Sequence, residues 1–320
     1  MTDPTPDAPT RRGAHDRLLA ASLQAVDVTD GTPVRSGGGV VGYRADHTLP
    51  LRVELIRQLR RRRTQIIGLI LLVLPVIIAL AFKAGGTGSS SNNPNADPSA
   101  LVTLATTGGA NFAMFTEFAA VGFLLVVIVA LFCGDAVASE ASWSSLRYLL
   151  ALPVPRSRLL RQKLTVALGF SVAVNVLLPV WAYLVGGVFF GWAPARSPIS
   201  GEFTSAQTVL RLGIVVLYAT GQALTVAALA FLLSVVTDAP LGAVGGATFL
   251  VVISNILDSI TALDPYRRFL PTHFQYQWLD ALGPGVQWAD MIRGTGLSLV
   301  YTSVFLLLAW RHFLHKDITS

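Results

Sequence analysis

Long, uninterrupted apolar stretches constrain this chain more than any other feature of its sequence. About 20 consecutive apolar residues in an α-helix cross the roughly 30 Å hydrocarbon core of a bilayer. Stretches of this kind recur along the chain and are separated by polar, glycine-rich or proline-containing segments. The sequence therefore predicts an all-α polytopic membrane protein with six transmembrane helices, at about residues 65–82, 112–137, 164–190, 208–236, 241–257 and 294–313.

The composition also favours a membrane protein over a soluble one. Only 13% of the 320 residues are charged and 52% are hydrophobic, whereas soluble domains carry about 25% charged residues. The one cysteine, Cys133, lies inside an apolar stretch. An intrachain disulfide is therefore excluded, and a small packing residue is the better interpretation of Cys133 than a reactive thiol.

The chain divides at about residue 50. Residues 1–49 are rich in Pro, Thr, Asp and Gly and contain no signal-peptide pattern, so we expect a disordered cytoplasmic tail before a membrane domain at 50–320. Residues 51–63 predict an amphipathic helix on an anionic leaflet, with leucines on one face. The arginines that we assign to this interface helix include Arg52, Arg57, Arg60 and Arg61. A nucleic-acid-binding patch is the weaker alternative, because these arginines adjoin a span and no aromatic stacking residues accompany them.

The distribution of basic residues predicts the topology. With the N-terminus inside, thirteen basic residues near the spans fall on the cytoplasmic side and six fall outside. Because cytoplasmic loops carry an excess of Lys and Arg, both termini are expected in the cytoplasm. Residues 134–163, between the second and third spans, are then cytoplasmic as well.

Residues 134–163 form the most informative of the connecting segments. Apolar side chains, among them Trp143, Leu146 and Leu150, recur at helical spacing, with basic residues beside them. Pro153 and Pro155 interrupt this helix, because proline lacks the amide hydrogen and clashes with the preceding turn. A short basic amphipathic helix between two spans indicates a contact surface at the membrane face.

Catalytic motifs are absent from the sequence. No G-x-x-x-x-G-K-[ST] motif is present, so this chain has no phosphate-binding loop of its own. The five histidines form no paired-ligand pattern, and no G-x-S-x-G motif indicates a hydrolase. We therefore expect neither an enzyme nor a metal site in this chain, and the scarcity of charge within the spans disfavours a proton-driven carrier.

A few polar residues within the spans are candidates for a transport pathway. Glu117 either lines a substrate cavity or is an interfacial carboxylate near a helix N-terminus, and the second interpretation is favoured. Asn175 and Gln222 lie in mid-span and need hydrogen-bond partners, which neighbouring helices would supply. Arg211 is expected to extend its head group to the interface from a span end.

Taken together, residues 51–320 resemble the permeases of the type 2 ABC exporter family, which includes drug- and antibiotic-export proteins. The resemblance rests on the cytoplasmic segment with its acidic Glu140, the small residues 141–145, the Arg/Leu-rich stretch 146–152 and the Pro-x-x-Arg element from Pro153 to Arg156. The six-span layout, the amphipathic helix before the first span and the basic-Asp-x-x-Ser ending also match. Residues 143–145, Trp-Ser-Ser, depart from the Gly-Thr that many members carry.

The resemblance implies a membrane-spanning subunit of an ATP-driven exporter for a hydrophobic or amphipathic substrate. A separate ABC ATPase subunit would bind ATP and Mg²⁺, and a second permease half would complete a homodimer in a bacterial plasma (inner) membrane. Coupling to the ATPase would involve Glu140, Trp143, Leu146, Arg147, Leu150, Pro153 and Arg156. Glu140 and Arg147 would either contact the ATPase or fix the fold of their own segment. The alternatives are a membrane anchor or regulatory subunit that translocates nothing, and a secondary transporter.

Overall fold

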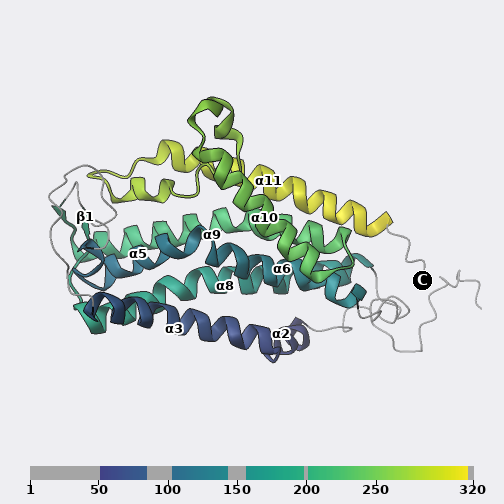
Figure 1. The fold of residues 1–320 in the computed structure, drawn as a ribbon, viewed down its shortest axis with the longest axis horizontal. Helices are drawn as coiled ribbons and strands as arrows, with labels where there is room; N and C mark the ends of the chain where they lie inside the picture. The colour runs from purple at the N-terminus through teal and green to yellow at the C-terminus, as the bar shows by residue number, and fades with distance from the viewer. Residues whose placement is uncertain (1–50, 85–102, 143–155, 198–200, 316–320) are drawn as a thin grey trace, which may run out of the picture. The chain divides into compact units, whose positions relative to one another are not determined.

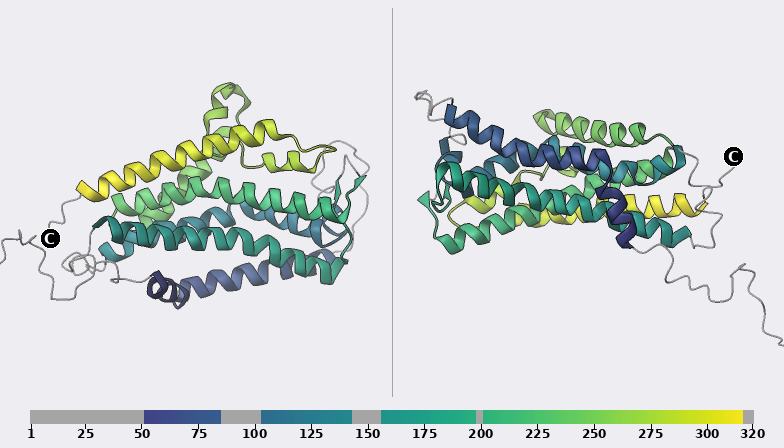
Figure 2. Two further views of the ribbon diagram at one scale, coloured as in Figure 1. Left: turned by 180° about the vertical axis from the view of Figure 1, so that it is seen from behind. Right: turned by 90° about the horizontal axis from the view of Figure 1, so that it is seen from below.

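The long helices run roughly side by side in the computed structural model of the protein (Figures 1 and 2). The structure describes residues 51–84, 103–142, 156–197 and 201–315, and all of them belong to one compact unit. Within these ranges, six helices are long and apolar enough to cross a membrane. The predicted all-α, multi-pass membrane protein is thereby confirmed.

The helices have the following bounds. The first half contains α2 (Leu51–Leu59), α3 (Arg62–Ala84), α5 (Gly109–Val121), α6 (Leu124–Ser142) and α8 (Arg156–Phe190). A short antiparallel pair, β1 (Arg196–Ser197) and β2 (Gly201–Glu202), leads into α9 (Ser205–Val236) and α10 (Pro240–Ser259). Three short 3-10 helices, η2 (Thr261–Leu263), η3 (Tyr266–Phe269) and η4 (Gln277–Leu282), then precede α11 (Trp288–His315).

Helix α6 lies at the centre of the bundle and is the most enclosed of the six apolar helices, whereas α3 and α11 face mainly outward. It packs against α8, α9 and α10, while α5 packs on α8 and α11 packs on α9 (Figure 1). Small side chains such as Ala136, Ala227 and Ala247 lie fully or almost fully buried where these helices meet. Small residues let helix backbones approach closely where lipid supplies no hydrophobic drive for association.

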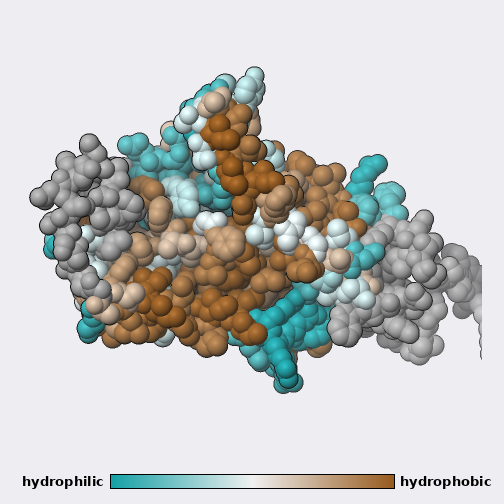
Figure 3. Space-filling view, in the orientation of Figure 1, coloured by the Kyte–Doolittle hydropathy of each residue, from teal (hydrophilic) through white to brown (hydrophobic). Residues whose placement is uncertain are grey.

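The outer surface is largely apolar along the bundle, as expected for contact with lipid tails (Figure 3). The hydrophilic patch near one end is α2, whose arginines follow the predicted amphipathic pattern (Figure 3). Residues 51–63 are not one helix, however. Helix α2 ends at Leu59 and α3 begins at Arg62, and the turn between them carries Arg61 toward the bundle.

The prediction of one continuous second span at about residues 112–137 is wrong. The span divides into α5 and α6, and residues 122 and 123 form a turn between the two helices. At Gly122 a Cβ would lie 2.6 Å from the hydroxyl of Tyr276, so a larger residue there would have to displace this side chain. Tyr276 comes from the segment between α10 and α11, and its ring also packs on Phe118 of α5. A contact more than 150 residues away in sequence therefore accompanies the break in the helix.

Candidate functional site at one end of the bundle

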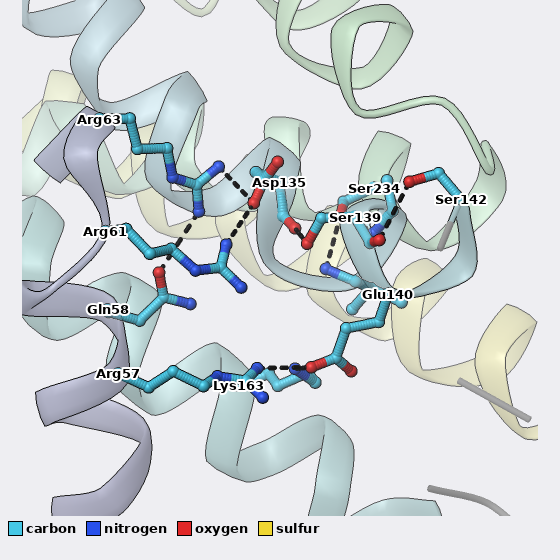
Figure 4. Close-up of polar contacts among 12 residues, drawn as sticks. Arg57, Gln58, Arg61, Arg63, Asp135, Ser139, Glu140, Ser142, Lys163 and Ser234 are labelled. Carbon is cyan, nitrogen blue, oxygen red and sulfur yellow. Dashed lines mark hydrogen bonds and ion pairs between the residues drawn. The ribbon is translucent and has the colours of Figure 1, made fainter. Parts of the chain in front are cut away.

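Four helix ends meet at one end of the bundle. Helix α6 finishes there at Ser142 and α8 starts there at Arg156, with α2 and the start of α3 beside them (Figure 1). Seven charged side chains from these elements interact there, and we call them the anchor cluster: Glu54, Arg57, Arg61, Arg63, Asp135, Glu140 and Lys163. Figure 4 labels all of them except Glu54.

Glu140 connects three elements of the anchor cluster. Its Oε1 atom lies 2.5 Å from Nζ of Lys163 on α8 and 2.6 Å from Nη2 of Arg57 on α2. Glu140 and Lys163 are each 5% exposed. Burial of a charge is tolerated only where a partner compensates for lost hydration, so this geometry makes the end of α6 depend on both neighbours.

Asp135 forms the second centre of the anchor cluster, slightly more than one turn before Glu140 on α6. Its Oδ2 atom lies 2.9 Å from Nη1 of Arg61 and also contacts the guanidinium of Arg63. Gln58 lies between the two centres, since its Nε2 donates to Glu54 at 3.1 Å and its Oε1 accepts from Arg63 at 3.3 Å. Both acidic side chains of α6 therefore face a row of cations (Figure 4).

Arg57 stays charged in this environment. Burial by itself lowers the pKa of Arg57, but the hydrogen bond to Glu140 and the nearby charges of Glu54 and Glu140 raise that pKa above its ordinary value. Glu54 also accepts from Arg57 within α2, at 3.1 Å. Arg57 is therefore a charged hydrogen-bond donor that links α2 to α6 near neutral pH.

A hydroxyl joins α6 to a fourth helix at the same level. The Oγ atom of Ser234, on α9, accepts hydrogen bonds from the backbone amides of Val137 and Ala138, each at 3.0 Å. Ser234 is completely buried. Near its end, α6 is thus held by side chains from α2, α3, α8 and α9.

A comparison with known families places the chain. Residues 76–319 match the family DUF2705, described as a protein of unknown function. The chain belongs to the DUF2705 family. It is also 26% identical, over 223 residues, to the uncharacterized protein YhcI of Bacillus subtilis (strain 168), an alignment that covers 67% of this chain and 68% of YhcI. Neither description names a function, so the resemblance to exporter permeases stays a prediction.

Several of the predicted coupling residues of this DUF2705 chain lie outside the described residues: Trp143, Leu146, Arg147, Leu150 and Pro153. Arg156 is the first residue of α8. Glu140 is buried and paired within the chain, which favours the second of its two predicted roles, fixing the fold around its own segment. Of the predicted interface arginines, Arg52 and Arg60 are exposed.

Arg57 and Arg61 belong to the anchor cluster, and the sequence analysis missed their acidic partners. Asp135 lies inside the predicted second span, next to the apolar residues that precede it. A carboxylate at such a position needs a cation, and the arginines of 57–63 form the densest basic group in the sequence. The pairing of Asp135 with these arginines could therefore have been predicted from the sequence. The pairing of Glu140 with Lys163 could not, because it depends on how α6 and α8 pack.

The structure corrects three expectations about polar residues inside the spans. Glu117 is not an interfacial carboxylate at a helix N-terminus, because α5 begins at Gly109, about two turns earlier, and Glu117 is fully buried. Asn175 does not bond to a neighbouring helix, since its Nδ2 donates to Ser171 of α8 itself at 2.8 Å. Arg211 does not extend to the interface. It is buried, donates to the carbonyls of Ala281 and Gly283, and stacks on Phe203.

Ion pairs distinguish the anchor cluster from these mid-bundle groups, although Nε of Arg63 also has no hydrogen-bond partner among the described residues. Both carboxylate oxygens of Glu117, Oδ1 of Asn175 and Nε2 of Gln222 have no hydrogen-bond partner among the described residues. The same part of the chain contains no group of three or more His, Cys, Asp or Glu side chains able to hold a metal ion. The polar groups that could bind a ligand inside the bundle are therefore single side chains such as Glu117, Asn175 and Gln222.

Proposed function

We propose that this chain is the membrane-spanning permease subunit of an ATP-driven ABC exporter for hydrophobic or amphipathic compounds. The observation that carries the proposal is the anchor cluster. It holds the last turns of α6 and the first turns of α8 against α2 and α3, on both sides of residues 143–155. A separate ATPase that pressed on residues 143–155 would therefore move two long helices together.

The arrangement of charge supports the same proposal. An exporter subunit without a phosphate-binding loop needs a stiff connection between its docking segment and its transmembrane helices. Lys163 and Glu140 provide this connection between α8 and α6, and Ser234 extends it to α9. In the proposed topology the cluster lies at the cytoplasmic side, both termini are cytoplasmic, and a second copy of the chain completes the pathway.

The test is reconstitution with a candidate motor. The full chain would be co-expressed with an ATPase that carries a Walker A motif and is encoded by a neighbouring reading frame, then placed in proteoliposomes. We expect ATP-dependent movement of a lipophilic fluorescent dye across the bilayer. An ATPase variant whose Walker A lysine is replaced by alanine is the control, and it should abolish transport.

Two outcomes would contradict the proposal and favour the alternatives. Dye transport by the chain alone, driven by an ion gradient and insensitive to ATP, would indicate a secondary transporter. A stable complex that hydrolyses ATP without moving any compound of a lipophilic panel would indicate an anchor or regulatory subunit.

A further inference from the structure

A cavity of about 350 Å³ lies in the middle of the bundle. Its wall comes from α5 and α6, α8, α9, α10, residues 270–275 and α11. Cavities of this size hold drug-sized or single-chain ligands in other proteins. The space is many times larger than the roughly 10–15 Å³ that a cavity needs to hold one water molecule.

The wall is apolar except at a few points, and two of those points are buried amides that each have one atom without a hydrogen-bond partner among the described residues. Asn175 is 1% exposed and Gln222 is 8% exposed, and both line the cavity. The bond from Nδ2 of Asn175 to Ser171 leaves Oδ1 as an acceptor, while Nε2 of Gln222 remains a donor. An amide left unsatisfied in an apolar interior is unfavourable, so these two atoms indicate a missing partner.

The other polar side chains at the wall have hydrogen-bond partners among the described residues, and Thr225 bonds to Ser298 of α11 at 2.8 Å. Ser254 on α10 bonds to Thr272 at 2.7 Å, and Gln275 donates to Asn255 at 3.0 Å. These bonds connect α10 to residues 272–275. On that side of the wall, Ser254, Thr272 and Gln275 all have hydrogen-bond partners among the described residues. The hydrogen-bonding end of an occupant is therefore expected at α8 and α9, where Asn175 and Gln222 lie.

The remaining wall defines the rest of the occupant. Leu250 and Leu257 of α10 line the cavity and are also exposed on the outer surface, which is apolar along α10 (Figure 3). The cavity therefore opens toward the surrounding lipid at this helix. No charged side chain of the described residues lines it, and Glu117 lies one turn before the wall residue Val121 on α5.

We propose that this cavity binds a neutral amphiphile, whose hydrogen-bonding group lies between Asn175 and Gln222 and whose apolar body lies toward α10 and α11. A hydroxyl or an amide has the chemistry required, because it can accept from Gln222 and donate to Asn175 at once. If the amphiphile is the exported compound, the inference rests on the proposed function. Binding itself requires no ATPase.

The experiment uses the purified full-length chain in phosphatidylcholine nanodiscs without any ATPase. The probe is a long-chain fatty alcohol that carries a photoactivatable diazirine, and mass spectrometry locates the cross-links. We expect cross-links at wall residues such as Leu250 and Phe305. Unlabelled fatty alcohol and fatty amide should compete, whereas an alkane, a fatty acid anion and a quaternary amine of equal chain length should compete on the order of tenfold less well.

Two variants test the polar end, and one tests the cavity itself. Gln222→Met and Asn175→Leu together should weaken fatty-alcohol binding on the order of tenfold and leave alkane binding unchanged. Thr220→Val is the matched control, since Thr220 lies on α9 but lines a different surface groove. Leu250→Trp, at an exposed position, should block the opening and abolish probe binding even if the amide variants fail to fold.

The outcomes separate this inference from the proposed permease function. Cross-links outside the cavity, or equal competition by alkane and alcohol, would mean that bulk lipid chains fill the space, and would overturn the proposal. Undiminished probe binding by the Leu250→Trp variant would also overturn the proposal, whether or not dye export persists. Specific binding without any ATP-dependent export would leave the site standing and remove the permease function.

Discussion

The anchor cluster and the mid-bundle polar groups handle buried polarity in opposite ways. In the anchor cluster, Asp135 and Glu140 each meet two cations from other elements. In mid-bundle, Glu117 and Asn175 are equally buried, yet their oxygens lack partners within the described ranges. Paired charges add constraint between helices, whereas unpaired polar atoms reduce stability unless something else binds them.

This difference separates two kinds of role. Each charged side chain of the anchor cluster has an ion-pair partner within the chain, so the cluster is best explained by mechanical linkage between α2, α6 and α8. An unpaired group is retained at a cost, and intramembrane polar residues of that kind are the first candidates for function. Substitutions should therefore lower stability at the anchor cluster and lower activity in mid-bundle.

The largest loss of stability is expected at Glu140. Among the described residues, Glu140→Leu leaves the buried Lys163 with only Glu54, which is 4.0 Å away, so we expect a loss of about 3–5 kcal/mol. The measurement is thermal unfolding of the purified chain in detergent. Adding Lys163→Met should recover most of the loss, because no charge is then buried alone. If the double variant lost the sum of the two single effects, the direct pairing would be disproved.

A smaller loss is expected at Asp135. Asp135→Asn removes a charge from two arginines whose side chains are each 27% exposed, so water compensates in part and the loss should be about 1–3 kcal/mol. Asp264→Asn is the matched control. Asp264 forms a pair of similar length with Arg267, at 2.8 Å, but on the surface, and its loss should not change the melting temperature. Equal decreases in melting temperature for both variants would show that the Asp135 pairs stabilise the chain no more than a surface ion pair does.

The sequence predicted most of the fold but little of this contrast. The apolar stretches located all six spanning helices, because length and hydropathy alone decide whether a helix can cross lipid. The break at Gly122 and the pairing of Glu140 with Lys163 escaped prediction, since both depend on residues distant in sequence. The sequence indicated that Asn175 and Gln222 need hydrogen-bond partners, which we expected from neighbouring helices. In the structure both residues line a cavity, which depends on how the helices pack.

The smallest effect on stability is expected at Glu117, and it tests the contrast most directly. Glu117→Gln keeps the shape of the side chain and removes a carboxylate whose oxygens have no described partner. Stability should therefore change by less than about 0.5 kcal/mol, or increase slightly. If the chain exports as proposed, dye transport should nevertheless fall, because an unpaired carboxyl in the bundle is retained for what it binds.

Glu117→Gln and Glu140→Leu should thus have opposite signatures in paired measurements of melting temperature and transport. The first should lose transport at full stability, and the second should lose stability first. A drop in melting temperature for Glu117→Gln as large as that for Asp135→Asn would mean that Glu117 has a structural partner. The distinction between anchoring and binding groups would then fail at this position, and the transport role would pass to Asn175 and Gln222 alone.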